Sequence, residues 1–148
     1  MTSQTTRRGM MLGILAAAAL LAGCAGMGES KPAKERVVIQ VSDGNPGTWN
    51  LALNVIENLN ASYAKRQAAS EIVLVAFGPG LPMLRDDAVV ASRVRDAMKS
   101  GAQMVACENT MRRSKVTKDL MLDKIAYVEA GVIHIIEKQQ QGWSVVRP

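Results

Sequence analysis

Aromatic side chains are scarce in this sequence of 148 residues, where they make up 3% of the chain as two Trp, two Tyr and one Phe. Proteins that bind single-stranded nucleic acid stack the bases on aromatic rings, so this composition argues against that class. The basic residues are scattered, and the formal net charge of +5 includes Arg7 and Arg8, which lie in a segment expected to be removed. Without these two, 16 basic residues face 13 acidic ones, which leaves +3. We therefore expect no nucleic-acid partner.

Histidine and cysteine are also rare, with one and two residues respectively. His134 lies among isoleucines in a predicted helix, where a lone histidine more often packs at a partly exposed position than binds a metal. No HExxH sequence, Ser/His/Asp set or carboxylate pair stands out, and the glycines match neither GxGxxG nor a Gly-Lys-Ser/Thr phosphate loop. We therefore assign no metal site and no cofactor.

The N-terminus, residues 1–23, has the layout of an export signal: a basic start at Arg7-Arg8, an apolar run over residues 10–21, then small residues. Leu21-Ala22-Gly23-Cys24 resembles a bacterial lipobox, in which cleavage precedes a cysteine that is then lipidated. An uncleaved membrane anchor is the alternative, but the apolar run is short for a span of ~20 residues. We expect a lipid on Cys24 to hold the protein at the periplasmic side of a bacterial membrane. The segment around Arg7-Arg8 also resembles a twin-arginine motif, so export by the general secretory route or by that route is open.

Residues 24–35 are small, polar and contain Pro32, which is typical of a flexible linker between lipid and domain. The sequence has two cysteines, Cys24 and Cys107. If Cys24 carries the lipid, Cys107 has no partner for an intrachain disulfide, and a free thiol is unusual in an oxidising compartment.

Residues 36–148 suffice for one domain with a core of its own. Apolar, β-branched runs predict strands over 36–41, 71–77, 102–107, 125–128 and 143–146. Between them we predict a helix over 48–66, one that Asp86-Asp87 caps and Ser100-Gly101 ends, and a short one over 108–113. Two further helices are expected, one capped by Thr117 and one from Gly131 to Gly142 with Val132, Ile133 and Ile136 facing inward. Gly78-Pro79-Gly80 is expected to form a turn. Strands that alternate with helices in this way indicate an α/β domain with a parallel sheet covered on both sides.

Cys107 ends the third predicted strand, and polar residues able to start a helix follow it at once. Backbone N–H groups and the positive end of a helix dipole would favour its thiolate, with Arg112 and Arg113 adding to the effect and Glu108 opposing it. The alternative is a small buried cysteine that packs like a hydrophobe. Ligands of open parallel sheets bind at the carboxyl ends of the strands. The substrate-binding residues expected at this edge are Asp43, Asn45, Gly78, Gly80, Asn109 and Thr110.

Five segments together resemble the DsrE/DsrF-like family, in its small, poorly characterised branch: VVIQVSDGNPGTWNLALNVIENL, VAFGPGLPML, ACENTMRR, VTKDLM and AGVIHIIEKQQQGWSVVRP. The resemblance covers residues 36–148. It implies a three-layer α/β/α sandwich with a mostly parallel sheet of about five strands, assembled as trimers or hexamers. It also implies a role in sulfur relay, in which Cys107 carries sulfur as a persulfide received from a donor and passed to an acceptor protein.

Two functions follow as hypotheses. The first is an envelope-anchored sulfur carrier, which need not turn over a substrate by itself. The second is a non-catalytic ligand-binding or assembly lipoprotein that uses the same edge as a pocket or subunit interface. A redox sensor in which Cys107 pairs between subunits ranks below both. The reactivity of Cys107 separates the first two, because a carrier needs an accessible thiol of low pKa.

Overall fold

The computed structural model describes residues 34–148, which belong to one compact unit, Pro32–Pro148. The predicted export signal over residues 1–23, Cys24 and all but the last two residues of the predicted linker lie outside the described part. Within the described part, no helix combines the length and apolar character needed to cross a membrane.

Five strands, four α-helices and two 3-10 helices make up the described chain. In chain order they are β1 (Glu35–Val41), α1 (Pro46–Lys65), β2 (Ser70–Ala76), η1 (Gly78–Leu84), α2 (Ala91–Lys99), β3 (Gln103–Cys107), α3 (Glu108–Ser114), η2 (Lys118–Leu120), β4 (Ala126–Val128), α4 (Gly131–Gln140) and β5 (Ser144–Val146). All five strands were predicted from their apolar runs, with ends that differ by one or two residues at most.

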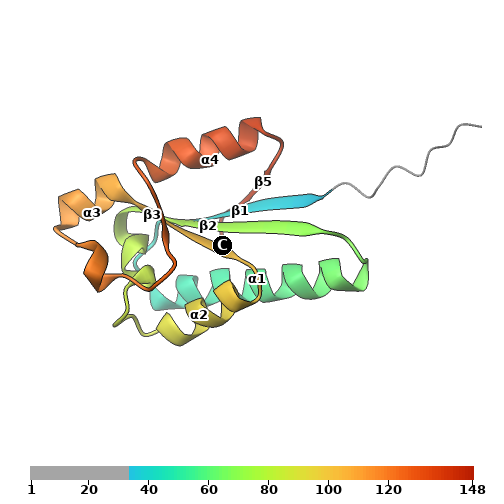
Figure 1. The fold of residues 1–148 in the computed structure, drawn as a ribbon, viewed down its shortest axis with the longest axis horizontal. Helices are drawn as coiled ribbons and strands as arrows, with labels where there is room; N and C mark the ends of the chain where they lie inside the picture. The colour runs from blue at the N-terminus through green and yellow to red at the C-terminus, as the bar shows by residue number, and fades with distance from the viewer. Residues whose placement is uncertain (1–33) are drawn as a thin grey trace, which may run out of the picture. The chain divides into compact units, whose positions relative to one another are not determined.

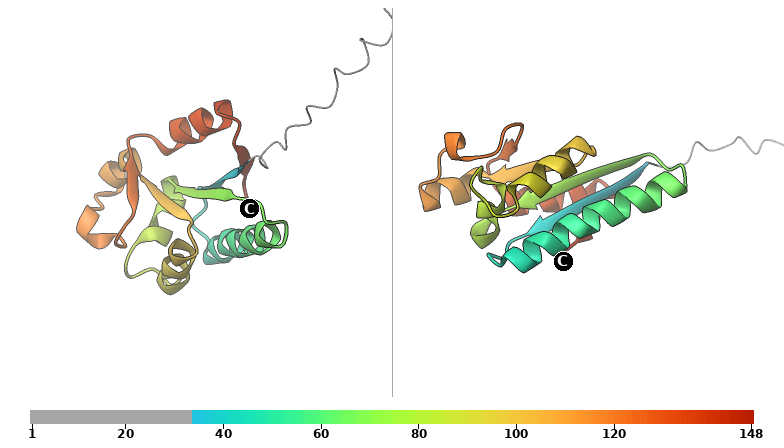
Figure 2. Two further views of the ribbon diagram at one scale, coloured as in Figure 1. Left: turned by 45° about the vertical axis from the view of Figure 1, so that its right-hand side comes forward. Right: turned by 90° about the horizontal axis from the view of Figure 1, so that it is seen from below.

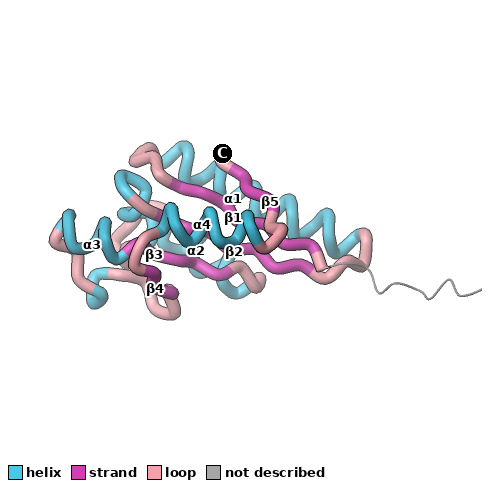
Figure 3. Tube along the Cα trace, turned by 90° about the horizontal axis from the view of Figure 1, so that it is seen from above, coloured by secondary structure: helices cyan, strands magenta, loops and turns pink. Residues whose placement is uncertain are grey.

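The sheet has the strand order β4-β3-β2-β1-β5, and each neighbouring pair is parallel. The longest pairing, β1 with β2, runs in register from Glu35 opposite Ser70 to Val41 opposite Ala76. The short strands β4 and β5 form the two edges (Figure 3). The predicted parallel sheet is confirmed.

Helices cover both faces of the sheet, with α1 and α2 on one side and α4 on the other (Figures 1 and 2). The strands are buried on both faces: in β1, Ile39 joins the larger core beneath α1 and α2, whereas Val38 joins a smaller core beneath α4. The smaller core includes Ile135 of α4 and Trp143. The domain is therefore the expected three-layer α/β/α sandwich.

The prediction for the apolar face of α4 was wrong. Val132 and Ile133 are each 51% exposed and Ile136 is 44% exposed, whereas Ile135 is 5% exposed. Four of the five residues over 132–136 are apolar, so their spacing does not select one face. The close approach of Gly131 to the sheet decides which face of α4 is buried, because Ile135 follows one turn later on the same side of the helix.

Three local predictions also need correction. Gly78-Pro79-Gly80 is the beginning of the 3-10 helix η1 rather than a plain turn. Asp86 and Asp87 do not cap α2, which begins at Ala91 with Val90 as the N-cap residue; they pair instead with Arg95 and Arg85. Thr117 makes no side-chain capping bond, and only the short η2 follows it.

Candidate functional site

Cys107 is the last residue of β3 and the N-cap residue of α3, with extended backbone angles (φ −83°, ψ 112°). Its side chain is 5% exposed and points toward the α4 side of the sheet, where Gly131 approaches it. The predicted position at a strand end before a helix is confirmed. The cysteine is the one free thiol of the described residues.

The first residue of α4 lies directly against Cys107. A Cβ atom built on Gly131 would come within 3.2 Å of the Cβ of Cys107, the Cβ of Phe77 and Cγ1 of Val75. Only glycine brings the backbone this close, and the nearby N–H of Gly131 favours the thiolate of Cys107. In the thiol form, the S–H of Cys107 has the carbonyl oxygen of Glu129 as its acceptor at 3.7 Å.

The pKa of the Cys107 thiol is lowered, although burial, the largest single influence, raises it. The hydroxyl of Thr110 and the backbone N–H groups of Gly131, Thr110 and Asn109 lower the pKa, because they favour the thiolate. In the thiol form Cys107 makes no side-chain capping bond to α3, and the N–H of Asn109 donates to the carbonyl oxygen of Glu129 at 3.0 Å. Hydrogen bonds to a charged form favour that form, and here their sum exceeds the effect of burial. The N–H groups come from the first turns of two helices, α3 and α4.

Thr110 connects this sulfur to the neighbouring strand. Its hydroxyl oxygen accepts the N–H of Gly78 at 2.9 Å, which leaves the hydroxyl hydrogen for the sulfur of Cys107. Gly78 begins η1, two residues after the end of β2, and has φ +53°, a conformation that glycine adopts without strain. The expected binding residues Gly78, Thr110 and Asn109 therefore gather around Cys107, with the backbone of Asn109 as the contributing group.

The other expected binding residues act within the fold: Asp43 and Asn45 lie in the β1–α1 loop, and Gly80 lies in η1. Asn45 is the N-cap residue of α1 and accepts the N–H of Gly47 at 2.8 Å, while Asp43 accepts the N–H of Asn45 at 2.7 Å. A Cβ on Gly80 would lie 2.4 Å from the carbonyl oxygen of Val41. Because Gly80 lacks a side chain, η1 can approach the end of β1, so Gly80 makes a backbone contact within the fold.

Two charged residues that follow Cys107, Glu108 and Arg112, bind other side chains. The guanidinium of Arg112 donates to the side-chain oxygen of Asn109, and Glu108 pairs with Lys118 at 2.9 Å. The shift of the Cys107 pKa comes from burial and hydrogen bonds, not from Arg112 or Arg113 as we had expected.

A cavity of about 470 Å³ lies beside the thiol environment. Its lining residues are Val128, Glu129, Ala130, Ile133, His134 and Glu137. Glu129 supplies the carbonyl oxygen near the sulfur, and Val128 of β4 is the register neighbour of Cys107. His134 is partly buried, as predicted, and burial lowers its pKa, with Lys138 acting the same way and Glu137 opposing.

Sequence reasoning missed the roles of Gly131 and Glu129. The sequence places Gly131 at the predicted start of a helix, yet only the packing of α4 over β3 shows that its N–H reaches the sulfur. Among residues 34–148 no group of three or more His, Cys, Asp or Glu side chains is placed to hold a metal ion.

Comparisons with known proteins agree with this architecture. The model of the DsrE/DsrF-like family matches residues 36–148. A solved structure of a protein of unknown function from Methanobacterium thermoautotrophicum, MTH1491, is 30% identical, with a TM-score of 0.72 over 77% of this chain and 99% of that one. A conserved protein of unknown function from Bacteroides thetaiotaomicron, BT1422, shares the fold at 17% identity, with a TM-score of 0.60 over 78% of this chain and 94% of that one. No curated protein matches. From Arg36 to its end, the chain belongs to the DsrE/DsrF-like family.

Proposed function

We propose that this protein is an envelope-anchored sulfur carrier that holds sulfane sulfur as a persulfide on Cys107. The family is associated with sulfur relay, which supports the class of chemistry. The observation that carries the proposal for this chain is the place of Cys107 as the N-cap residue of α3 against Gly131, the first residue of α4, with N–H and O–H donors nearby that lower its pKa. Such donors favour a thiolate, which is the nucleophilic form of cysteine.

The loading step needs no oxidant beyond the donor itself. The Cys107 thiolate attacks the terminal sulfur of a persulfide or polysulfide, a new S–S bond forms, and the S–S bond of the donor breaks. The leaving thiolate takes the bonding electron pair and then a proton from water. The carrier is left as Cys–S–S⁻, whose charge is accommodated by the same N–H and O–H groups. Transfer to an acceptor thiolate repeats the exchange in the other direction.

Access to the buried sulfur is the second requirement of a carrier. We place the approach of the donor at the cavity lined by Val128, Glu129 and Ile133, because Glu129 belongs both to this cavity and to the surroundings of the sulfur. The 5% exposure of Cys107 limits attack to small or extended donors unless the Glu129–Gly131 segment moves.

The expected lipid anchor suits this arrangement. The chain enters the sheet at Glu35, the amino end of β1, while Cys107 lies at the carboxyl end of the parallel strand β3. A lipid on Cys24 would therefore attach the domain by the edge opposite to the thiol.

A second candidate function is a non-catalytic assembly protein, favoured by the exposed side chains of Val132, Ile133 and Ile136 on α4. Exposed apolar groups of this kind mark contact surfaces in many proteins. The same surface would serve a carrier that assembles as a trimer or hexamer, so assembly alone does not separate the two functions. The reactivity of Cys107 separates the two functions.

The test is the intact mass of the compact unit, residues 32–148, after exposure to polysulfide. Cys107 is the one cysteine in this unit, so any sulfur adduct on a thiol reports on it. A carrier gains the mass of one or more sulfur atoms, loses it on treatment with a thiol reductant, and gains none as Cys107→Ser. A native protein that takes up no sulfur, and takes it up only after denaturation, would leave the assembly function as the better account.

A further inference from the structure

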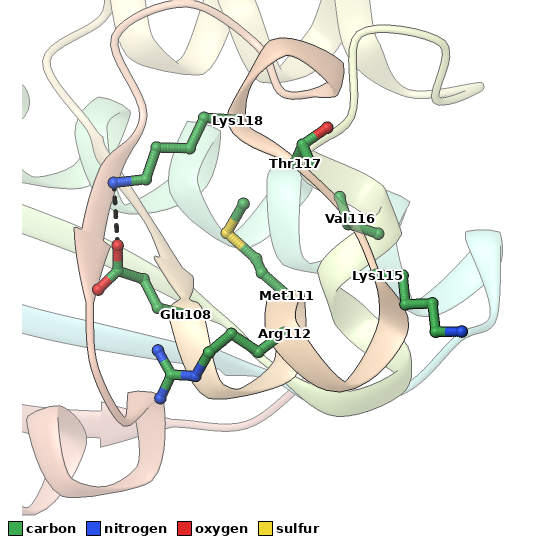
Figure 4. Close-up of a pocket in the computed structure, with 7 residues that line it drawn as sticks. All are labelled: Glu108, Met111, Arg112, Lys115, Val116, Thr117 and Lys118. Carbon is green, nitrogen blue, oxygen red and sulfur yellow. Dashed lines mark ion pairs between the residues drawn. The ribbon is translucent and has the colours of Figure 1, made fainter.

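A second cavity, of about 460 Å³, lies between α3 and the segment that follows it. We call it the α3 cavity, and its lining residues are Glu108, Met111, Arg112, Lys115, Val116, Thr117 and Lys118 (Figure 4). Its volume falls within the range of small-molecule sites. The candidate site at Cys107 does not use it.

The floor of the α3 cavity is apolar. Met111 is 4% exposed and belongs to the larger core, and Val116 packs against the same core. Figure 4 shows Met111 at the centre of the group, with the Glu108–Lys118 pair on one side of it and Val116 on the other. Most of the lining surface is apolar, so a ligand would place an apolar body here.

The rim of the α3 cavity carries an excess of positive charge. Three of the lining residues are cationic, namely Arg112, Lys115 and Lys118, and one, Glu108, is a carboxylate. Figure 4 shows Arg112 and Lys118 on the side of Glu108 and Lys115 on the side of Val116. Lys118 is fixed by Glu108 at 2.9 Å and by the ring of Tyr127 at 4.3 Å from its centroid. Lys115 makes no ion pair with any residue of the described chain, and its left-handed backbone (φ 54°) ends α3 beside the cavity.

The α3 cavity lies on the other side of the sheet from the thiol. Met111 at its floor joins the core beneath α1 and α2, whereas the sulfur of Cys107 faces Gly131 on the α4 side. The two sites share only the junction of β3 and α3. A ligand in the cavity would therefore not be a reactant at Cys107.

We propose that the α3 cavity binds a small amphiphilic anion, an organic carboxylate or sulfonate with a short apolar body. The apolar part lies against Met111 and Val116, and the anionic group lies at the rim beside Lys115. A neutral or cationic ligand of the same size gains the apolar contact but not the charge interaction. This selectivity follows from three cations and one carboxylate at one opening.

The probe set is hexanoate, hexanol and hexylamine, which share an apolar body and differ in charge. Each is titrated into the ¹⁵N-labelled unit of residues 32–148, and amide shifts are followed by NMR. We expect hexanoate to shift amides of residues 111–118 saturably and to bind at least fivefold more tightly than hexanol. Hexylamine should bind more weakly still. Equal shifts from all three probes, or hexanoate shifts centred outside this segment, would overturn the proposal.

Two lysine variants give a matched comparison. Lys115 and Lys124 both have left-handed backbones, with φ of 54° and 64°, but only Lys115 lines the α3 cavity. Lys115→Gln should weaken hexanoate binding about threefold to tenfold, while Lys124→Gln should bind as the wild type does. Equal affinities of the two variants would refute the role of the rim charge. Binding should persist in Cys107→Ser, so failure of the sulfur-carrier proposal would leave this result intact.

Discussion

The hydroxyl of Thr110 is the contact at Cys107 that can be removed with the least change in shape. Thr110→Val replaces a hydroxyl by a methyl of similar size, and it deletes both the donation to the sulfur and the acceptance from the Gly78 N–H at 2.9 Å. We expect a higher pKa for the Cys107 thiol and therefore slower alkylation at pH below that pKa.

The expected change in the thiolate fraction follows from the charge of the hydrogen-bond acceptor, the thiolate of Cys107. A hydrogen bond to a charged group is worth ~1.5–3 kcal/mol, which corresponds to roughly 13-fold to 160-fold in the thiolate fraction. A thiolate of higher pKa is also a better nucleophile, with a Brønsted coefficient of about 0.4–0.5. This compensation reduces the loss in alkylation rate to about fourfold to twentyfold. The unpaired N–H of Gly78 should also lower the free energy of unfolding by ~1–3 kcal/mol.

The assay is the rate of iodoacetamide modification of the folded unit as a function of pH, monitored by intact mass. Thr110→Ser keeps a hydroxyl and should retain most of the wild-type rate. Thr117→Val is the matched control, because Thr117 makes no side-chain capping bond and lies outside the thiol environment. If Thr110→Val and wild type show the same pH profile, then the hydroxyl does not stabilise the thiolate and the proposed basis of reactivity is refuted.

Three further predictions concern stability and assembly. Gly80→Ala should destabilise the fold by ~1–3 kcal/mol or more, because its Cβ would lie 2.4 Å from a backbone oxygen, whereas Gly44→Ala meets Pro79 at an ordinary 3.4 Å; equal denaturation midpoints would contradict this. Because the pKa of the Cys107 thiol is lowered, the free energy of unfolding of the wild type should rise relative to Cys107→Ser as the pH rises from the folded-state pKa toward the usual 9.0. Above pH 9.0 the difference should stay constant. If denaturant unfolding shows a difference between the two proteins that does not change with pH, the thiolate is not stabilised. Ile133→Asp, on the exposed side of α4, should reduce a trimer or hexamer to smaller species by light scattering, and a wild type that is already monomeric would refute the assembly.

The sequence by itself determined the sheet and the place of the thiol within it. Runs of β-branched residues such as Val37–Val41 are buried on both faces, which only a covered parallel sheet provides, and all five strands appear where these runs lie. Gly101 ends α2 with φ +99° and Gly142 follows α4 with φ +83°, as their positions in the sequence had indicated. Cys107 ends β3 because the apolar run stops there. These features depend on local composition and chain order, which the sequence states directly.

Tertiary packing decided which groups meet at the edge. The sequence pattern was interpreted as burying Val132, Ile133 and Ile136, whereas the approach of Gly131 to Cys107 buries Ile135. Polar residues after β1 were expected to join the site, yet the side chains of Asp43 and Asn45 accept backbone N–H groups at the N-terminus of α1.

The pKa of the Cys107 thiol also depends on tertiary packing. Burial and hydrogen bonding act on the Cys107 pKa in opposite directions, and two of the groups involved, Glu129 and Gly131, lie more than twenty residues further along the chain. Their distance from the sulfur depends on how α4 packs across β3 rather than on any local pattern. The sequence thus placed a cysteine at a strand end, and only the folded chain surrounded it with the donors that favour a thiolate.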